Sequence, residues 1–260
     1  MTAPAALRPA ASSPAPELSV TGLRVAYDRD VEILRGVDVV AAARGITVVI
    51  GPNGAGKSTM LKAIAGLAPV TGGSVSLGGA DILRLPSRDL LRRGLAFVPQ
   101  EGTLFGQMTV RENLRLGGWL RRRERGWLAR RVDEIASQFG MSGTMLARRA
   151  GDLSGGQQKL LEIARGLVLA PTVLLLDEPT AGLSPKLAAQ VYDRVAALPR
   201  AAEVTILLVD QNVRAALEIA TEVYVLAMGR NDARGTPADI SARLGEITAG
   251  WMTEGASGAG

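Results

Sequence analysis

The stretch ITVVIGPNGAGKSTMLKAIAG, from Ile46 to Gly66, decides the fold of this chain. A β-branched run, Ile46–Ile50, enters a glycine-rich loop, and the loop opens directly into a helical pattern. The loop reads Gly51-xxxx-Gly56-Lys57-Ser58, a phosphate-binding pattern when it lies between a strand and a helix. Glycines let the backbone wrap round an anion, and the helix start directs free N–H groups and a positive dipole end at it. We therefore expect a nucleoside triphosphate here, the alternative being a glycine turn before a core helix.

Each residue type in this loop has a chemical task. The backbone of Gly51, Pro52, Asn53, Gly54, Ala55 and Gly56 forms the phosphate cradle. Lys57 is expected to reach the β- and γ-phosphates, the Ser58 hydroxyl to bind Mg²⁺, and Thr59 to hold the α/β end. Only four of the 30 basic residues are lysines, and one of them stands at this position. A slim, flexible point charge suits that position better than a guanidinium. ATP and Mg²⁺ are therefore the expected ligands.

Composition limits the remaining possibilities. The chain has 260 residues, enough for one domain with a subdomain, and 47% hydrophobic content with 3% aromatics predicts an aliphatic core. So few aromatic residues disfavour a platform for single-stranded nucleic acid, and we expect no nucleic-acid partner. The absence of cysteine and histidine excludes disulfides, thiolate metal sites and imidazole acid–base chemistry. A net charge of +5 fits an anionic partner surface or plain solubility.

The ends of the chain differ in composition from its middle. Residues 1–16 are rich in Ala, Pro and Ser and are expected to be disordered, and residues 251–260 to form a flexible tail. Residues 17–250 are then the folded domain. Without an apolar run of about 20 residues or a signal-peptide core, the chain is expected in the cytosol.

Between these ends, apolar strands alternate with helical segments. We predict strands at Leu18–Tyr27, Val37–Ala43, Ile46–Ile50, Ser74–Leu77, Ala96–Val98, Val173–Leu176, Val204–Val209 and Val223–Met228. We predict helices at Ala188–Leu198 and Val213–Ala220, and a turn at Gly229. Residues 109–168 are mostly helical in pattern. Continuous apolar strands alternating with helices predict a mostly parallel sheet covered on both faces, with the helical stretch, about 103–166, inserted between strands.

A second motif, VLLLDEP, covers Val173 to Pro179. Four apolar residues predict a buried strand, and Asp177 and Glu178 follow at its carboxyl end, where open α/β sheets bind ligands. Asp177 suits Mg²⁺ coordination, and Glu178 suits a general base that polarises a water for attack on the γ-phosphate. The alternative is a strand end with two solvated acids.

A third motif, LSGGQ, runs from Leu153 to Gln157 and opens a helix that extends to about Val168. Small residues at a helix start can form a second anion site. Ser154 is also a good N-cap, so a capped helix start is the structural alternative.

Together these motifs resemble the ATP-binding-cassette (ABC) ATPase family. LSGGQ matches its signature sequence, GPNGAGKST its phosphate loop and VLLLDEP its magnesium and catalytic strand. Gln100 matches its glutamine loop, and AGLSP, from Ala181, its loop toward the partner subunit. The resemblance, from about Leu18 to Gly235, implies a RecA-like P-loop α/β core, a small antiparallel β subdomain and an inserted α-helical subdomain.

The resemblance also assigns roles. Gln100 would sense the metal and the attacking water, and Tyr27 would stack on adenine, although a strand-end core residue is the alternative there. The signature residues Ser154, Gly155, Gly156 and Gln157 would bind the ATP held by the other subunit, so that turnover requires a dimer.

The chain departs from the family at one position. Where the family usually has a histidine that contacts the γ-phosphate, this chain has Gln211, in the run Leu208-Val-Asp-Gln-Asn212. An amide donates a hydrogen bond but cannot become cationic. We still assign Gln211 to the catalytic site and expect activity, reduced or dependent on a partner subunit.

The same region resembles the smaller ATPase of branched-chain (hydrophobic) amino-acid uptake systems and their urea and amide relatives. That resemblance implies integral membrane permease subunits, a second ATPase subunit (a different chain or a second copy), an indirect solute-binding protein, and a place at the cytoplasmic face of the membrane. Import of urea or amides, an exporter ATPase and a soluble ABC protein without a permease are the alternatives.

One stretch is not explained by these motifs. Residues 119–131, WLRRRERGWLARR, are strongly basic. They fit either a solvated helix face or a surface near anionic headgroups, with Trp119 and Trp127 at the interface.

Overall fold

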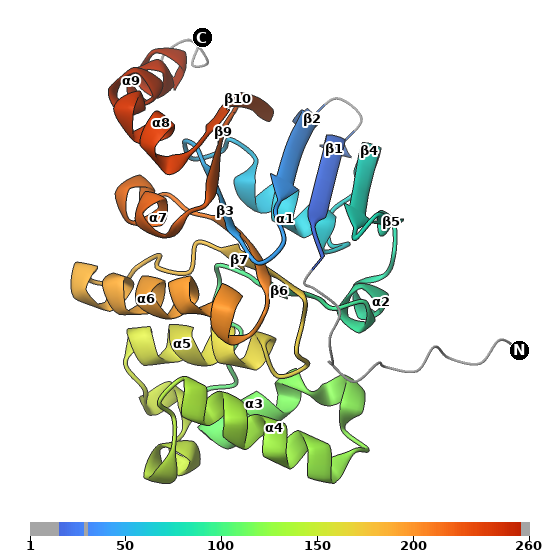
Figure 1. Ribbon diagram of the computed structural model, residues 1–260, viewed down its shortest axis with the longest axis vertical. Coiled ribbons are helices and arrows are strands. Elements are labelled where there is room, and N and C mark those ends of the chain that lie inside the picture. Colours follow the sequence, from blue (N-terminus) through green and yellow to red (C-terminus); the bar gives the residue numbers. More distant parts are fainter. Residues whose placement is uncertain (1–15, 29–30, 256–260) are drawn as a thin grey trace, which may run out of the picture.

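The strands of the protein lie in two sheets that stand side by side in the computed structural model, which describes residues 16–28 and 31–255 (Figure 1). The strands are β1 (Leu18–Asp28), β2 (Val31–Ala41), β3 (Ile46–Ile50), β4 (Val70–Leu77), β5 (Ala80–Asp81), β6 (Leu95–Val98), β7 (Val173–Asp177), β8 (Thr205–Val209), β9 (Glu222–Ala227) and β10 (Arg230–Gly235). The helices are α1 (Lys57–Ile64), α2 (Ser87–Arg92), α3 (Val110–Gly117), α4 (Arg125–Gln138), α5 (Gly155–Gly166), α6 (Pro185–Ala201), α7 (Val213–Ile219), α8 (Pro237–Ala242) and α9 (Leu244–Gly255).

The larger sheet has the strand order β10-β9-β3-β8-β7-β6, and every pairing in it is parallel except that of β9 with β10. The smaller sheet, β2-β1-β4-β5, is antiparallel. The predicted fold class, a mostly parallel core with a small antiparallel β subdomain, is therefore confirmed.

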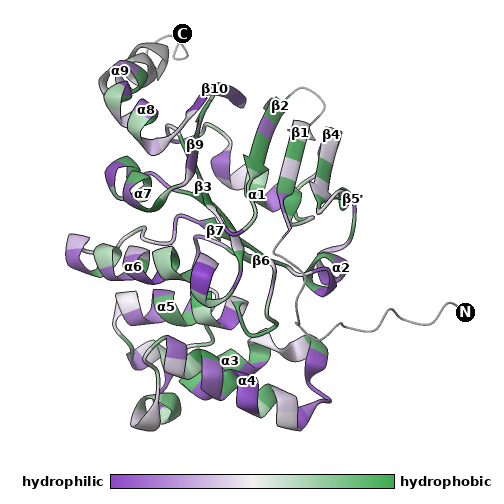
Figure 2. Ribbon diagram, viewed as in Figure 1, coloured by the Kyte–Doolittle hydropathy of each residue, from purple (hydrophilic) through white to green (hydrophobic). Residues whose placement is uncertain are grey.

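Alternate residues of the central strands supply two separate hydrophobic cores. One face of the larger sheet packs against α1 and the antiparallel sheet, and the other packs against helices α3 to α7. In β7, for example, Leu175 belongs to the first core, whereas Leu174 and Leu176 belong to the second. Burial on both faces explains why these strands are continuously apolar in sequence. Figure 2 shows hydrophobic colour along the central strands and alternating hydrophobic and hydrophilic colours on α4 and α6.

The parallel register brings three strand ends to one edge of the sheet. Val49 of β3 pairs with Val209 of β8, and Asp177 of β7 pairs with the same residue. The segments that follow these strands, which begin at Gly51, Glu178 and Asp210, therefore emerge next to one another. This edge is where the motifs of the sequence are brought together.

The helical elements between β6 and β7 are less regular than their sequence pattern suggests. Three α-helices, α3 to α5, alternate with 3₁₀ turns at Trp119–Arg121, Gly143–Ala147 and Ala150–Asp152. Glycines at 117–118 and 140–143 interrupt the helical pattern. The limits of this insertion, 103–166, stay a prediction.

The chain end differs from the prediction. The flexible tail expected at 251–260 is helical as far as Gly255, because α9 continues through Trp251, which packs against the larger core. Residues 256–260, and residues 1–15 of the segment 1–16 that is expected to be disordered, lie outside the described residues. Within the described part of the chain, no helix is both long and apolar enough to span a bilayer.

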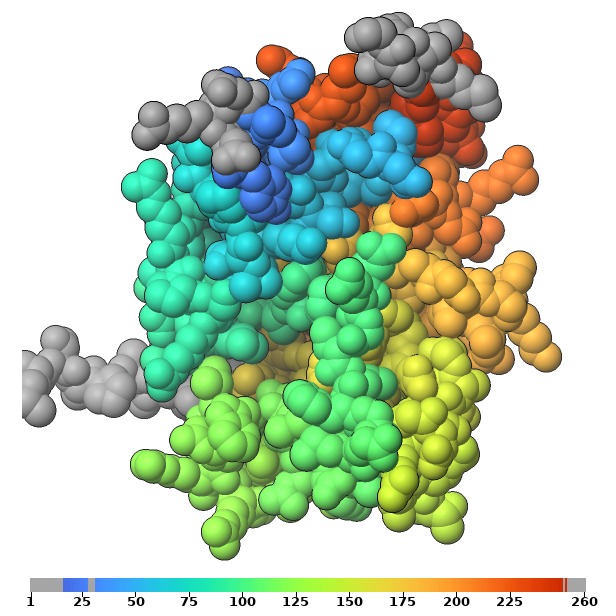
Figure 3. Space-filling view, turned by 180° about the vertical axis from the view of Figure 1, so that it is seen from behind, coloured from blue at the N-terminus to red at the C-terminus, as the bar shows by residue number. Residues whose placement is uncertain are grey.

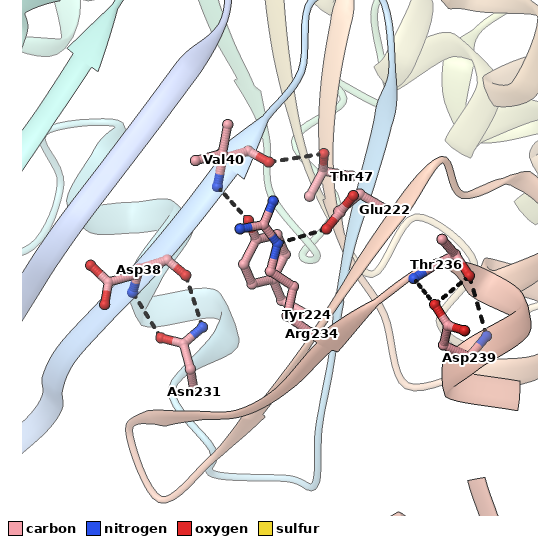
Figure 4. A network of polar contacts seen from close by, with 9 residues as sticks. All are labelled: Asp38, Val40, Thr47, Glu222, Tyr224, Asn231, Arg234, Thr236 and Asp239. Carbon is pink, nitrogen blue, oxygen red and sulfur yellow. Dashed lines mark hydrogen bonds and ion pairs between the residues drawn. The ribbon is translucent and has the colours of Figure 1, made fainter. Parts of the chain in front are cut away.

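Polar side chains join the two sheets where β2 passes β9 and β10 (Figure 4). The Asn231 side chain makes two hydrogen bonds of 2.8 Å with the backbone of Asp38, one to its N–H and one to its carbonyl. The Tyr224 hydroxyl accepts from the N–H of Val40 at 3.1 Å, and the Arg234 guanidinium lies over the Tyr224 ring. These contacts fix the antiparallel sheet to the strand that flanks β3.

The turn between β9 and β10 contacts the glycine-rich loop. Met228 and Gly229 both have positive φ, as in a type I′ hairpin turn. The N–H of Gly229 donates to the carbonyl of Ala55 at 3.1 Å, and its carbonyl accepts from the N–H of Arg35 at 2.8 Å. A Cβ on Gly229 would lie 2.1 Å from the carbonyl oxygen of Ile33, so this position has no room for a side chain.

We predict that Gly229→Ala lowers the free energy of unfolding by roughly 1–3 kcal/mol, since it adds a backbone clash to a positive φ. Denaturant unfolding followed by circular dichroism measures this change. Gly245→Ala is the matched control, because its Cβ would meet nothing within 4 Å and its position is helical. A Gly229→Ala protein as stable as the control would contradict the assigned role of the turn.

Candidate nucleotide-binding site

The glycine-rich loop is built between β3 and α1, as predicted. A Cβ on Gly51 would lie 2.1 Å from the carbonyl oxygen of Leu226 in β9, so only glycine allows this approach. Gly56, with φ of 98°, stands at the N-cap of α1 and offers no side-chain cap to the first turn. The N–H groups of that turn therefore stay available for an anion. Asn53 and Gly54 form the exposed tip of the loop.

Lys57 is the cation of this loop and lies buried beneath it. Its ammonium donates to the carbonyls of Gly51 at 2.8 Å and Pro52 at 3.0 Å. Burial lowers the pKa of Lys57, whereas the nearby carboxylates of Glu178, Asp177 and Asp210 oppose that shift. The loop thus holds a positive charge close to its own backbone.

Ser58, at the second position of α1, meets the end of β7. Its hydroxyl donates to Asp177 Oδ1 at 2.8 Å, although the two residues are 119 positions apart in the sequence. Burial raises the pKa of Asp177, while the Ser58 hydrogen bond acts in the opposite direction. The predicted pair of magnesium ligands is therefore in contact.

Glu178 lies between two amide side chains. Gln100 Nε2 donates to its Oε2 at 2.9 Å, and Gln211 Nε2 donates to its Oε1 at 2.6 Å. The residue is 5% exposed and has a positive φ of 44°, an unusual conformation for a residue with a side chain. Its N–H donates to the carbonyl of Val209 at 2.9 Å. The alternative of a solvated acid at a strand end is therefore wrong, because both carboxylate oxygens have partners.

A buried network behind Glu178 was not anticipated from the sequence. Asp210 accepts from the Tyr192 hydroxyl at 2.8 Å, from the N–H of Asn212 at 2.9 Å and from the Thr180 hydroxyl at 3.4 Å. Burial and the neighbouring Asp210 carboxylate raise the pKa of Tyr192, so its hydroxyl stays a donor. The network joins Thr180, two residues after Glu178, to Asp210, the residue before Gln211.

Helix α5 holds the backbone that carries Gln100. Lys159 donates to the carbonyl of Gln100 at 3.1 Å and pairs with Glu162 at 2.7 Å. Glu162 accepts from the N–H of Thr103 at 2.7 Å, and Arg165 donates to the Thr103 carbonyl at 2.8 Å. The three side chains are spaced three residues apart on one helix. In the sequence, that spacing indicates that they lie on the same face of the helix.

The signature residues lie at the start of α5. Ser154 and Gln157 form a capping box, with Gln157 N–H donating to Ser154 Oγ and Ser154 N–H donating to Gln157 Oε1. Gly155 and Gly156 face Leu183 and Leu187, where a Cβ would fit only tightly. Among the described hydrogen bonds, none connects these residues to the glycine-rich loop.

Tyr27 stands near the end of β1 with 54% of its surface exposed. The core alternative for this residue is therefore wrong. The structure gives it no hydrogen bond to the described part of the glycine-rich loop, so its stacking role stays a prediction.

Comparison with known proteins agrees with this geometry. Residues 34–181 match the family model described as "ABC transporter". The chain is 42% identical over 212 residues to the "Probable branched-chain amino acid transport ATP-binding protein LivF" of Archaeoglobus fulgidus, covering 82% of this chain and 89% of that protein. It is 36% identical over 204 residues to the "High-affinity branched-chain amino acid transport ATP-binding protein BraG" of Pseudomonas aeruginosa, covering 78% and 86%.

Solved structures extend the comparison to the whole fold. The structure superposes with a TM-score of 0.82 on the ADP conformation of an ATP-binding cassette of an ABC transporter, at 28% identity, covering 90% of this chain and 97% of that one. A nucleotide-free ATP-binding cassette gives a TM-score of 0.81 at the same identity. The chain therefore belongs to the ABC transporter family, of which it is an ATP-binding and ATP-hydrolysing subunit.

Proposed function

We propose that this chain supplies the energy for import of branched-chain amino acids by hydrolysing ATP at the edge formed by β3, β7 and β8. Glu178, held between Gln100 and Gln211 beside the glycine-rich loop, is the observation that carries the catalytic part of the proposal. The cargo is supported by the names of the relatives at 42% and 36% identity, which are branched-chain amino acid transport proteins over most of their length.

Binding is assigned to the loop from Gly51 to Thr59. The first-turn N–H groups of α1 donate to the phosphate oxygens, and Lys57 exchanges its two backbone carbonyls for β- and γ-phosphate oxygens. The exchange replaces neutral acceptors by charged ones, which favours the ammonium form of a buried lysine. Tyr27 is proposed to stack on the adenine.

The residues present also fit Mg²⁺. Ser58 Oγ and Asp177 Oδ1 lie 2.8 Å apart, and Mg²⁺ in proteins is typically bound by one or two protein oxygens together with phosphates and water. Ser58 and Asp177 would hold the ion, with Gln100 close to it, and a bound ion neutralises charge on the β- and γ-phosphates.

Glu178 is proposed as the general base. Its carboxylate takes a proton from a water whose oxygen forms the new bond to the γ-phosphorus, while the bond from that phosphorus to the ADP oxygen breaks. Gln100 and Gln211 fix the orientation of the carboxylate, because each binds one of its two oxygens. Gln211 thus acts through Glu178 in this structure.

A second subunit completes the site in this proposal. The signature residues Ser154, Gly155, Gly156 and Gln157 would close on ATP held by a partner ATPase, either a different chain or a second copy. The two would act on integral membrane permease subunits at the cytoplasmic face of the membrane, with a solute-binding protein delivering the cargo.

We predict that Glu178→Gln leaves ATP affinity within about threefold of the wild type and lowers kcat by roughly 10²–10⁴-fold, since only the proton acceptor is lost. Fluorescent-nucleotide titration and phosphate release measure the two quantities. Lys57→Ala is the matched comparison and is expected to weaken ATP binding. Rapid hydrolysis by Glu178→Gln would remove this residue as the base, and undiminished affinity of Lys57→Ala would contradict the binding assignment.

We predict that Gln211→Ala lowers kcat by roughly 10- to 100-fold with little change in KM for ATP, because a hydrogen bond to a charged group contributes about 1.5–3 kcal/mol. Gln211→His keeps a donor and is expected to match or exceed the wild-type rate. Steady-state ATPase assays between pH 6 and 8 compare the three proteins. Equal rates for wild type and Gln211→Ala would show that the amide does not orient Glu178.

The cargo is tested by identifying what accompanies the tagged full-length chain from detergent-solubilised native membranes. We expect two permease subunits, a second ATPase and, on reconstitution with a solute-binding protein, ATP-dependent uptake of leucine. Uptake of urea or an amide in place of leucine would overturn the assignment of the cargo but not the importer function. Recovery of ribosomal or DNA-bound proteins without a permease would overturn the importer function and leave the ATPase chemistry intact.

A further inference from the structure

The strongest concentration of charge in this chain lies outside the ATP site, in the stretch from Trp119 to Arg131. These residues contain six arginines and one glutamate, a net charge of +5 that equals the formal net charge of the whole chain. The rest of the sequence therefore carries no net formal charge. The stretch forms the 3₁₀ turn at Trp119–Arg121, a short connection and the first half of α4.

Two of the six arginines are used by the fold. Arg121 lies over the Trp127 ring, 3.7 Å from its centroid, and pairs with Glu124. Arg131 donates to the carbonyls of Leu167 and Val168 at the end of α5. These two side chains fix the corner between α3, α4 and α5.

The other four arginines face solvent, and we call them the basic corner: Arg122, Arg123, Arg125 and Arg130. None of the four forms an ion pair with an acidic residue in the described part of the chain. Side chains of this region stand out at the lower left of the molecule in Figure 3. Four unpaired cations within nine residues repel one another in water, and an anionic surface removes that repulsion.

Trp119 adds an apolar group to this corner. It is 58% exposed, and the Arg122 guanidinium lies 4.7 Å from the centroid of its ring. An exposed tryptophan beside arginines combines an apolar body, a polar N–H and positive charge, a combination that suits the headgroup level of a bilayer. A strand of nucleic acid would need several stacking rings, whereas Trp127 is half-buried under Arg121.

We propose that the basic corner and Trp119 form a binding surface for an anionic phospholipid bilayer. The arginines attract the headgroup phosphates, and the Trp119 ring enters the interface beside them. The surface holds the helical part of the subunit against the membrane by a contact that involves no other protein. It depends neither on the ATP site nor on the transported solute, so a chain that hydrolyses ATP normally can still fail the test.

The test is sedimentation of the full-length chain with vesicles of phosphatidylcholine that contain about 30% phosphatidylglycerol, or none, at about 0.1 M and about 1 M salt. We expect binding to the anionic vesicles at low salt and a large loss at high salt. Replacing all four arginines of the basic corner by glutamine should lower the partition coefficient by roughly 10²–10³-fold, since each contributes roughly fivefold. Trp119→Ser should lower it by a smaller factor.

The matched control removes the same charge elsewhere, through Arg88→Gln, Arg93→Gln, Arg200→Gln and Arg230→Gln, all at exposed positions. It is expected to bind anionic vesicles within about threefold of the wild type, and unchanged melting temperatures show that both variants fold. An equal loss in the control would mean that total charge alone drives binding and would overturn the proposal. Wild-type binding to neutral vesicles at the same level, or no binding to anionic ones, would overturn it as well.

Discussion

Three carboxylates lie almost fully buried at the carboxyl edge of the larger sheet, and the arrangement of the site depends on how each is compensated. Asp177, Glu178 and Asp210 all act on the ammonium of Lys57, and Lys62 also acts on Asp177. Two cations do not neutralise three anions, and buried charges without partners are costly. Each carboxylate therefore has its own hydrogen-bond donors: Ser58 for the first, two glutamines for the second, and Tyr192 with Thr180 and a backbone N–H for the third.

This compensation explains the character of the position that differs from the usual family pattern. Glu178 needs a hydrogen-bond donor from this position, and Gln211 supplies one without adding an ionisable group beside the buried Asp210. A glutamine satisfies that condition at every pH. With no histidine anywhere in the chain, no imidazole ionises near neutral pH, and the orientation of Glu178 rests on amides alone.

The elements that the sequence predicts best are those with one dominant signal. The strand Ile46–Ile50 agrees to the residue, because a β-branched run ends at a glycine, and β7 extends the predicted Val173–Leu176 by one residue. Helix α2, strand β10 and helices α8 and α9 were not predicted: α2 and α8 have six residues each, β10 is polar, and α9 is interrupted by glycines in its sequence. Strand β2 begins at Val31, six residues earlier than expected, because pairing with β1 outweighs the polar Glu32 and Arg35.

The site residues follow the same division. Loop, signature and strand-end motifs are local in sequence and were found, as was Gln100. The Tyr192–Asp210 contact spans 18 residues, and Glu162 reaches Thr103 across 59. Pairings of that kind arise only when the chain is folded, so a single sequence contains no pattern that would reveal them.

Helix α5 couples two distant parts of the molecule mechanically. Its first turn carries the signature residues. Farther along the helix, Lys159, Glu162 and Arg165 form hydrogen bonds with the backbone of Gln100 and Thr103. The Gln100–Glu178 hydrogen bond is 2.9 Å long, and a lengthening of roughly 0.6 Å would break it. A rigid helix transmits displacement along its full length, so a tilt of α5 small enough to leave its packing intact would release one oxygen of Glu178. The orientation of the Glu178 carboxylate would therefore depend on the position of a helix end that it does not touch.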